Sequence, residues 1–193
     1  MSKKTKAAVV AVAIAASGFG LYKLGSKMLS GDAAKAEHLS NQVWIQRLPT
    51  DSRDIIGHVV FIEHRRGKFG AVGRSSQWRH SAEIFQWNMQ GDTLGMHFPQ
   101  DRMKGKAKVR TWECEGEAPE PFELCLEISN GDRKVNFYSR KDWEIDVDKA
   151  EKSFAKIVKD EPALAGMGLP EGLEDLEQEE KLDVDEMPNV FTF

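Results

Sequence analysis

The chain has only two cysteines, and none precedes Cys114. This scarcity excludes a lipid-modified cysteine near the N-terminus and excludes zinc modules built from several cysteines. Histidines with the spacing of metal ligands are also missing, since His58 and His64 lie six positions apart on one alternating segment. The sequence therefore predicts no metal site and no cofactor.

Catalytic motifs are missing as well. The stretch 67–73 has the glycines of a phosphate loop but lacks the Lys-Ser/Thr that should follow, so it is better interpreted as a glycine-containing strand. His80 and Ser81 are neighbours, yet adjacent residues of a strand point to opposite faces. Without a plausible acid–base pair, we expect the protein not to be an enzyme.

One long hydrophobic run is present, at residues 7–24, behind the basic residues Lys3, Lys4 and Lys6. As a helix it measures about 27 Å, close to the thickness of a bilayer's apolar layer. Residues 1–28 are therefore predicted to be a signal or anchor segment, with membrane contact through residues 7–24. A cleaved signal peptide and a soluble helix are the alternatives. Residues 29–37 are expected to be a linker.

Eight short segments with alternating polarity follow the linker. Their spacing and the turn pairs Gly91-Asp92 and Asn130-Gly131 favour antiparallel neighbours joined by tight turns. We therefore predict an all-β domain over residues 38–143, an eight-stranded up-and-down antiparallel barrel, with a two-sheet sandwich as the alternative. The candidate strands are 42–48, 58–65, 69–78, 82–89, 93–98, 106–114, 122–128 and 134–140.

The alternation assigns apolar side chains to the inside of this barrel. Phe122, Leu124, Leu126 and Ile128 share one face, while Glu123, Cys125 and Glu127 share the other. A packed core and a ligand pocket give the same pattern. The residues predicted to line the interior, and to contact any bound ligand, are Phe85, Trp87, Met96, Phe98 and Phe137.

Cys114 and Cys125 fall on the charged face of adjacent predicted strands. A disulfide between them is geometrically reasonable and is typical of an oxidising compartment, whereas two free thiols are the alternative. The disulfide agrees with an exported domain. We expect the protein in the cell envelope, anchored to the membrane with the barrel outside the cytoplasm, or secreted after signal cleavage.

A basic row, 104–110, stands beside Trp112 on one strand, which is a pattern that can contact nucleic acid. Glu123 and Glu127 on the next strand can pair with these cations, and such cross-strand pairing is the commoner arrangement. No nucleic-acid partner is expected.

The last fifty residues carry the negative charge. Residues 144–193 hold 15 acids and 5 lysines, within a chain whose formal net charge is −4. Residues 144–160 have an apolar stripe with helical spacing, which predicts an amphipathic helix packed on the outside of the barrel. Residues 161–193 are expected to be an acidic, mostly disordered tail whose end, 189–193, can dock on a protein partner.

An early-strand tryptophan (Trp44), an eight-strand meander, a following helix and a late arginine (Arg140) together resemble the lipocalin-like, or calycin, barrels. The family's Gly-x-Trp reads Gln42-Val43-Trp44 here, so the resemblance is carried mainly by architecture. It implies that Trp44 and Arg140 form a barrel-closing pair, stabilised by cation–π stacking.

The resemblance also implies a function. The expected protein is a membrane-tethered or exported lipocalin-like barrel that binds a small apolar ligand or lipid. The alternative is a structural or protein-interaction module with a filled barrel, which uses its surface or its acidic tail.

Overall fold

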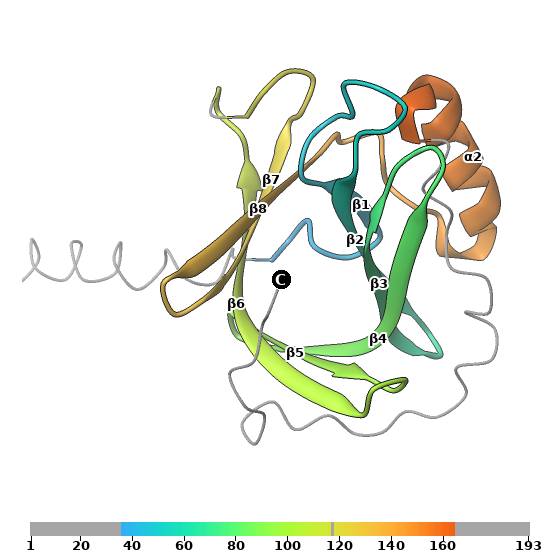
Figure 1. Ribbon diagram of the computed structural model, residues 1–193. Coiled ribbons are helices and arrows are strands. Elements are labelled where there is room, and N and C mark those ends of the chain that lie inside the picture. The colour runs from blue at the N-terminus through green and yellow to red at the C-terminus, as the bar shows by residue number, and fades with distance from the viewer. Residues whose placement is uncertain (1–35, 117, 165–193) are drawn as a thin grey trace, which may run out of the picture. The chain divides into compact units, whose positions relative to one another are not determined.

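The computed structural model describes residues 36–116 and 118–164, and all eight predicted strands are present in them. Each strand pairs antiparallel with the next, and β8 returns to β1, so the sheet is a closed barrel (Figure 1). The predicted fold class is confirmed, and the sandwich is excluded. The strands are β1 (Gln42–Ile45), β2 (Ile56–His64), β3 (Gly67–Ser75), β4 (His80–Gln90), β5 (Thr93–Phe98), β6 (Met103–Glu113), β7 (Leu124–Asn130) and β8 (Arg133–Ser139).

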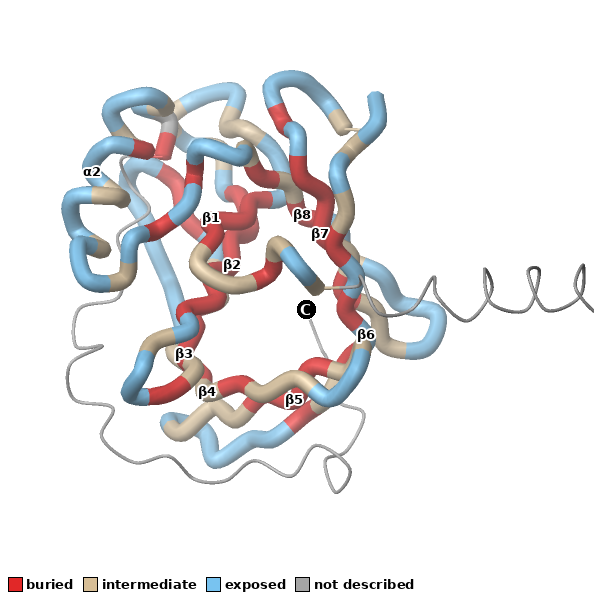
Figure 2. The backbone as a smooth tube through the Cα atoms, turned by 180° about the vertical axis from the view of Figure 1, so that it is seen from behind, coloured by how far each residue is buried: buried red, intermediate tan, exposed pale blue. Residues whose placement is uncertain are grey.

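The strand register separates inner from outer side chains. Val59 of β2 stands opposite Trp44 and Val72, and all three pack in the inner cluster, whereas Val60 belongs to the outer one. The buried members of the inner cluster are Leu39, Trp44, Val59, Phe61, Phe85, Trp87, Leu94, Met96, Ala107, Val109, Leu124, Leu126, Ile128 and Phe137. Figure 2 shows buried residues following the ring of strands, with exposed residues in the connections.

The seam between β1 and β8 is the shortest in the barrel. Only Ile45 and Tyr138 pair through the backbone there, because β1 has four residues. Side chains supply the rest: Ser139 Oγ donates to the Val43 carbonyl at 2.5 Å. Gln42 Nε2 donates to Ser139 Oγ at 2.7 Å and to the Arg140 carbonyl at 2.6 Å. Gln42 therefore helps to close this barrel.

Residues 36–41 cross one end of the barrel. The Asn41 N–H donates to the Phe61 carbonyl on β2, and the His38 N–H donates to Thr111 Oγ1 on β6. In a ring of eight strands β2 and β6 stand opposite each other, so the segment between these contacts spans the end. Leu39 is buried there under Trp44, whose Nε1 donates to the Leu39 carbonyl. We call this the closed end.

A helix covers part of the outer wall, as predicted. The turn η1 (Val147–Lys149) leads into α2 (Ala150–Asp160), and Ile157 is buried against outward-facing residues of β1 and β2. Figure 1 shows α2 beside these strands. A second turn, η2 (Pro162–Leu164), follows, and Leu164 is fully buried in the same outer cluster. The prediction had placed these residues in the disordered tail, 161–193, whereas 162–164 form a defined turn.

Other predictions concern residues outside the described part. The anchor over 7–24, nearly all of the linker and the tail beyond residue 164 belong to this group. Within residues 36–116 and 118–164, no helix has both the length and the apolar character needed to cross a membrane.

The predicted disulfide is confirmed. Cys114, which directly follows β6, is bonded to Cys125 on β7, with their Cα atoms 5.5 Å apart. The bond ties the two strands together at the closed end, where loop 114–123 connects them.

Replacing both cysteines with alanine should lower the free energy of unfolding by about 3 kcal/mol. The bond closes a loop and so restricts the conformations of the unfolded chain, which raises its free energy. Urea unfolding of the wild type with and without a reductant, beside the double variant, measures this. Equal midpoints in all three samples would contradict the prediction.

Acid should destabilise the barrel through His58. This side chain is only 5% exposed, with Nε2 2.8 Å from Ser75 Oγ, and burial first, then the charge of His80, lowers its pKa to about 4. The unfolded histidine takes up a proton near pH 6.5 and the folded one near 4. Stability from this group is therefore complete above pH 6.5 and is lost as the pH falls to 4, by about 3 kcal/mol.

Urea unfolding at several pH values, with His58→Gln as the comparison, tests this titration. The difference in unfolding free energy between the wild type and His58→Gln contains the contribution of His58 but not that of the carboxylates that titrate in the same pH range. A difference that stays constant between pH 6.5 and 4 would show the assignment to be wrong.

Candidate functional site

The five residues predicted to line the interior lie together on the inner wall. Four of them, Phe85, Trp87, Met96 and Phe137, are buried, and Phe98 is half-buried. The rings of Phe85 and Phe98 are in contact, with centroids 5.5 Å apart. Residues from β4, β5 and β8 thus form one apolar surface.

Phe61 is a central residue of this surface that the sequence reasoning did not identify. Its ring meets those of Phe85 and Trp87 edge-on, each at 5.6 Å. The run 59–62 is apolar on both faces because its outward residues belong to the outer cluster with α2, so alternation could not show which residues point inward. The indole N–H of Trp87 is satisfied by the Phe69 carbonyl at 2.8 Å.

Gly70 makes room for this aromatic group. A Cβ at this position would lie 2.3 Å from Phe85 Cζ and 2.7 Å from the Val60 carbonyl oxygen. The ring of Phe85 therefore packs directly on the β3 backbone. Gly70 therefore allows close packing, which agrees with the interpretation of the stretch 67–73 as a glycine-containing strand.

The inner wall is accessible at the end opposite residues 36–41. Val72, Phe98 and Val135 pack against the inner cluster, and the register places Met103 opposite Phe98, so all four are on the inner face. Nevertheless Val72, Phe98 and Val135 are only partly buried, and Met103 is 51% exposed. These inward-facing side chains are therefore in contact with solvent at this end. We call this the open end; its connections are 46–55, 76–79, 99–102 and 131–132.

The rim of the open end is polar. Arg74 and Ser81 stand opposite each other on β3 and β4, on the same inward face as Val72 and Glu83, and both are exposed. Arg133, at the start of β8, is on the inward face with Val135 and is exposed too. An apolar wall below a rim with two inward-facing arginines suits an amphiphilic molecule.

The two residues of the predicted barrel-closing pair have other neighbours. Trp44 is fully buried on the inner side of β1. The guanidinium of Arg140 instead lies over the ring of Trp143, 5.8 Å from its centroid, and is bonded to the Asp142 carboxylate at 2.8 and 3.0 Å. Arg140 comes after β8, where the chain turns outward, so its side chain reaches the outer cluster that contains Trp143.

The basic row on β6 is engaged in pairing on the outer wall. Arg110 lies 3.7 Å from the Glu127 carboxylate and stacks on Trp112 at 4.4 Å. Glu123, the second predicted partner, instead accepts a hydrogen bond from the Lys141 N–H.

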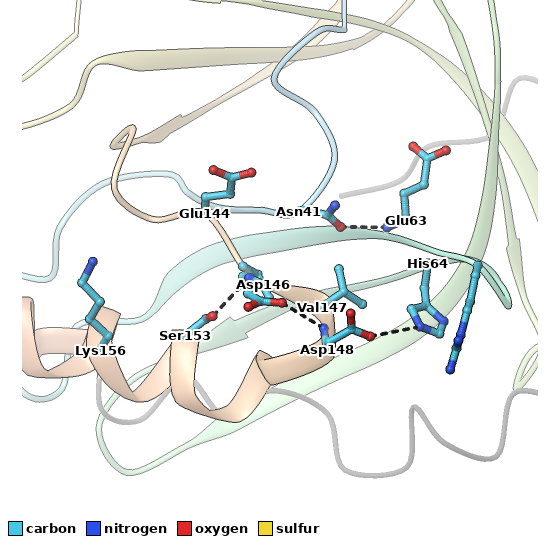
Figure 3. Close-up of a pocket in the computed structure, with 11 residues that line it drawn as sticks. Asn41, Glu63, His64, Glu144, Asp146, Val147, Asp148, Ser153 and Lys156 are labelled. Carbon is cyan, nitrogen blue, oxygen red and sulfur yellow. Dashed lines mark hydrogen bonds and ion pairs between the residues drawn. The ribbon is translucent and has the colours of Figure 1, made fainter.

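An open cleft of about 700 Å³ lies outside the barrel, between the end of β2 and the start of the helical segment (Figure 3). Its polar groups bond mainly to one another. The Asp146 N–H donates to Ser153 Oγ, the Asp146 carboxylate accepts from the Asp148 N–H, and His64 Nε2 lies 3.9 Å from the Asp148 carboxylate. These contacts fix the start of the helix against β2.

The polar groups of this outer cleft are engaged with one another, and the Asp148 side chain is 83% exposed. In the part of the chain that the structure describes, no three His, Cys, Asp or Glu side chains are grouped to hold a metal ion. The barrel interior with its open end is therefore the better candidate site.

Comparisons with known proteins identify no relative. No family model, no curated protein and no solved structure matches this chain. The function must therefore be argued from the barrel itself.

Gly70→Ala should destabilise the protein by about 1–3 kcal/mol, because the added methyl group overlaps the Phe85 ring and the Val60 carbonyl. Thermal and urea unfolding measure the loss. Adding Phe85→Leu should recover part of it, since the shorter side chain vacates the space of Cζ. An alanine variant as stable as the wild type would contradict the packing described here.

Proposed function

We propose that this protein is a lipocalin-like barrel of the cell envelope that binds a small apolar ligand or lipid and catalyses no reaction. The observation that carries the proposal is the accessible inner wall near the open end. Val72, Phe98 and Val135 are apolar, face inward and remain partly exposed. Apolar surface left in contact with water inside a barrel gains free energy when a ligand covers it.

The geometry limits where such a ligand fits. Phe61 packs against Phe85 and Trp87 on the β2–β4 side of the interior, and residues 36–41 cover the closed end. The ligand therefore enters from the open end and occupies the part of the interior above these rings. Arg74 and Arg133 on the rim favour a ligand with an anionic head group and an apolar chain.

The proposed location rests on two features. The Cys114–Cys125 disulfide supports a compartment outside the reducing cytoplasm. The apolar run 7–24 supports tethering to a membrane, or export if the segment is cleaved.

A photo-crosslinkable fatty acid with an aliphatic diazirine tests ligand binding in the full-length chain held in phosphatidylcholine membranes. After illumination, peptide mapping should place the crosslinks on the inner residues of β3, β5 and β8. Val135→Asp should reduce this labelling about tenfold, because it puts a charge on the apolar wall.

Asn136→Asp is the matched control, since it adds the same charge to the same strand on the exposed outer face. It should leave labelling unchanged, and thermal melts should show both variants folded. Labelling confined to residues outside the barrel, or equal in both variants, would contradict the proposal and favour a filled barrel.

A further inference from the structure

Among the described residues, three large apolar side chains are exposed, and all three lie at the open end. Trp78 is 76% exposed, Met103 51% and Ile55 45%. Successive connections of an up-and-down barrel alternate between its ends, so residues 46–55, 76–79 and 99–102 share one end. Ile55 and Trp78 belong to the first two connections, and Met103 directly follows the third. Exposed apolar groups gathered at one end indicate a surface that contacts another molecule or a membrane.

Hydrogen bonds hold the turn that carries Trp78 in one conformation. Ser76 Oγ accepts hydrogen bonds from the N–H groups of Trp78 and Arg79, and the Ser76 N–H donates to the Arg79 carbonyl at 2.7 Å. The Gln77 N–H donates to the Ser52 carbonyl at 3.2 Å, which joins this turn to the connection with Ile55. The indole is thus held outward on a fixed support.

Cations surround these apolar groups. Five exposed arginines of the open end form no ion pair with any described residue: Arg53, Arg74, Arg79, Arg102 and Arg133. Asp54 is paired with Arg47, and the other acids of this end are Asp51, Glu83, Asp101 and Asp132.

The closed end has more acids than basic residues. In the connection 114–123 the exposed acids Glu115, Glu120 and Glu123 have no basic residue in the same loop. The segment after β8 places Asp142, Glu144 and Asp146 at this end as well. Arg65, Arg66, Arg140 and Lys141 stand at this end too, so six acids face four cations here, whereas the open end has six arginines and five acids. An anionic surface therefore meets a small basic excess at the open end and a small acidic excess at the closed one.

We propose that the open end docks on an anionic lipid bilayer. Trp78 enters the interfacial layer together with Ile55 and Met103, while the arginines contact lipid phosphates. Indole rings favour this layer because they have an apolar body and one polar N–H, and guanidinium groups bind phosphate through paired hydrogen bonds. Ile55, Trp78 and Met103 each have an arginine within two positions of the sequence, and this arrangement suits a planar anionic surface.

This docking goes beyond ligand binding and does not depend on a cavity, since every residue it uses is on the rim. Where the barrel also holds a ligand, docking brings the mouth against the lipid. A barrel with a filled interior would still dock.

Tryptophan quenching in the full-length chain tests the proposal. Vesicles contain brominated phosphatidylcholine with about one third phosphatidylglycerol, because bromine on the acyl chains quenches only indoles that enter the bilayer. No tryptophan precedes Trp44, so the apolar run 7–24 contributes no signal. Trp44, Trp87 and Trp143 are at most 3% exposed, which leaves Trp78 and the half-buried Trp112 as the responsive indoles.

The wild type should be quenched, and Trp78→Ser should abolish the quenching. Trp112→Ser is the matched control, since Trp112 lies on the outer wall away from the rim, and this variant should be quenched like the wild type. Quenching that survives Trp78→Ser, or that disappears in Trp112→Ser, would overturn the proposal and point to a different face.

Charge reversal tests the electrostatic part. Arg79→Glu should shift the ratio of docked to undocked protein about tenfold toward the undocked state. Arg66→Glu makes the same change in an exposed turn at the closed end and should have no such effect. Equal effects of the two variants, or undiminished quenching on vesicles of brominated phosphatidylcholine alone, would overturn the role of anionic lipid.

Discussion

Closure of the sheet between β1 and β8 is the constraint on which the rest of the structure depends. The other seven strand pairs are backbone ladders of four to nine residue pairs, but this one has a single backbone pair. Gln42 and Ser139 supplement it with buried side-chain hydrogen bonds. Without closure, the apolar inner face and two strand edges would contact water, which is costly for a sheet of this size.

The same seam determines which end of the barrel is closed. The chain enters β1 through residues 36–41, which bond to β2 and β6 on opposite sides of the ring. Among the residues that the structure describes, only one end is crossed by such a segment, so the two ends differ in access and in exposed apolar surface. Both proposed properties, ligand entry and membrane docking, arise from the uncovered end.

The outer wall shows how a barrel strand becomes apolar on both faces. β2 contributes Val59 and Phe61 to the interior, and Val60 and Ile62 to a second core under α2. The helix, the turn η2 and Trp143 complete this second core. It stabilises the side of the barrel that holds the weak seam, because β1 is also buried on both faces.

The sequence by itself determined the strands, the antiparallel order, the disulfide and the amphipathic helix. These follow from local rules: alternation with period 2, turn residues with positive φ, and an apolar stripe with period 3.6. The five predicted lining residues lie on one inner surface for the same reason. Phe61 was missed because β2 has no alternation to show its direction.

Only the tertiary structure decided which distant side chains meet. Arg140 lies over Trp143, Gln42 bonds to Ser139 across the seam, and Leu164 is buried in the outer cluster. The structure alone also distinguishes the end with exposed Ile55, Trp78 and Met103 from the end that residues 36–41 cross. Such contacts depend on strand register and on the closure of the ring, which join residues nearly a hundred positions apart, whereas sequence periodicity reports only on neighbours along the chain.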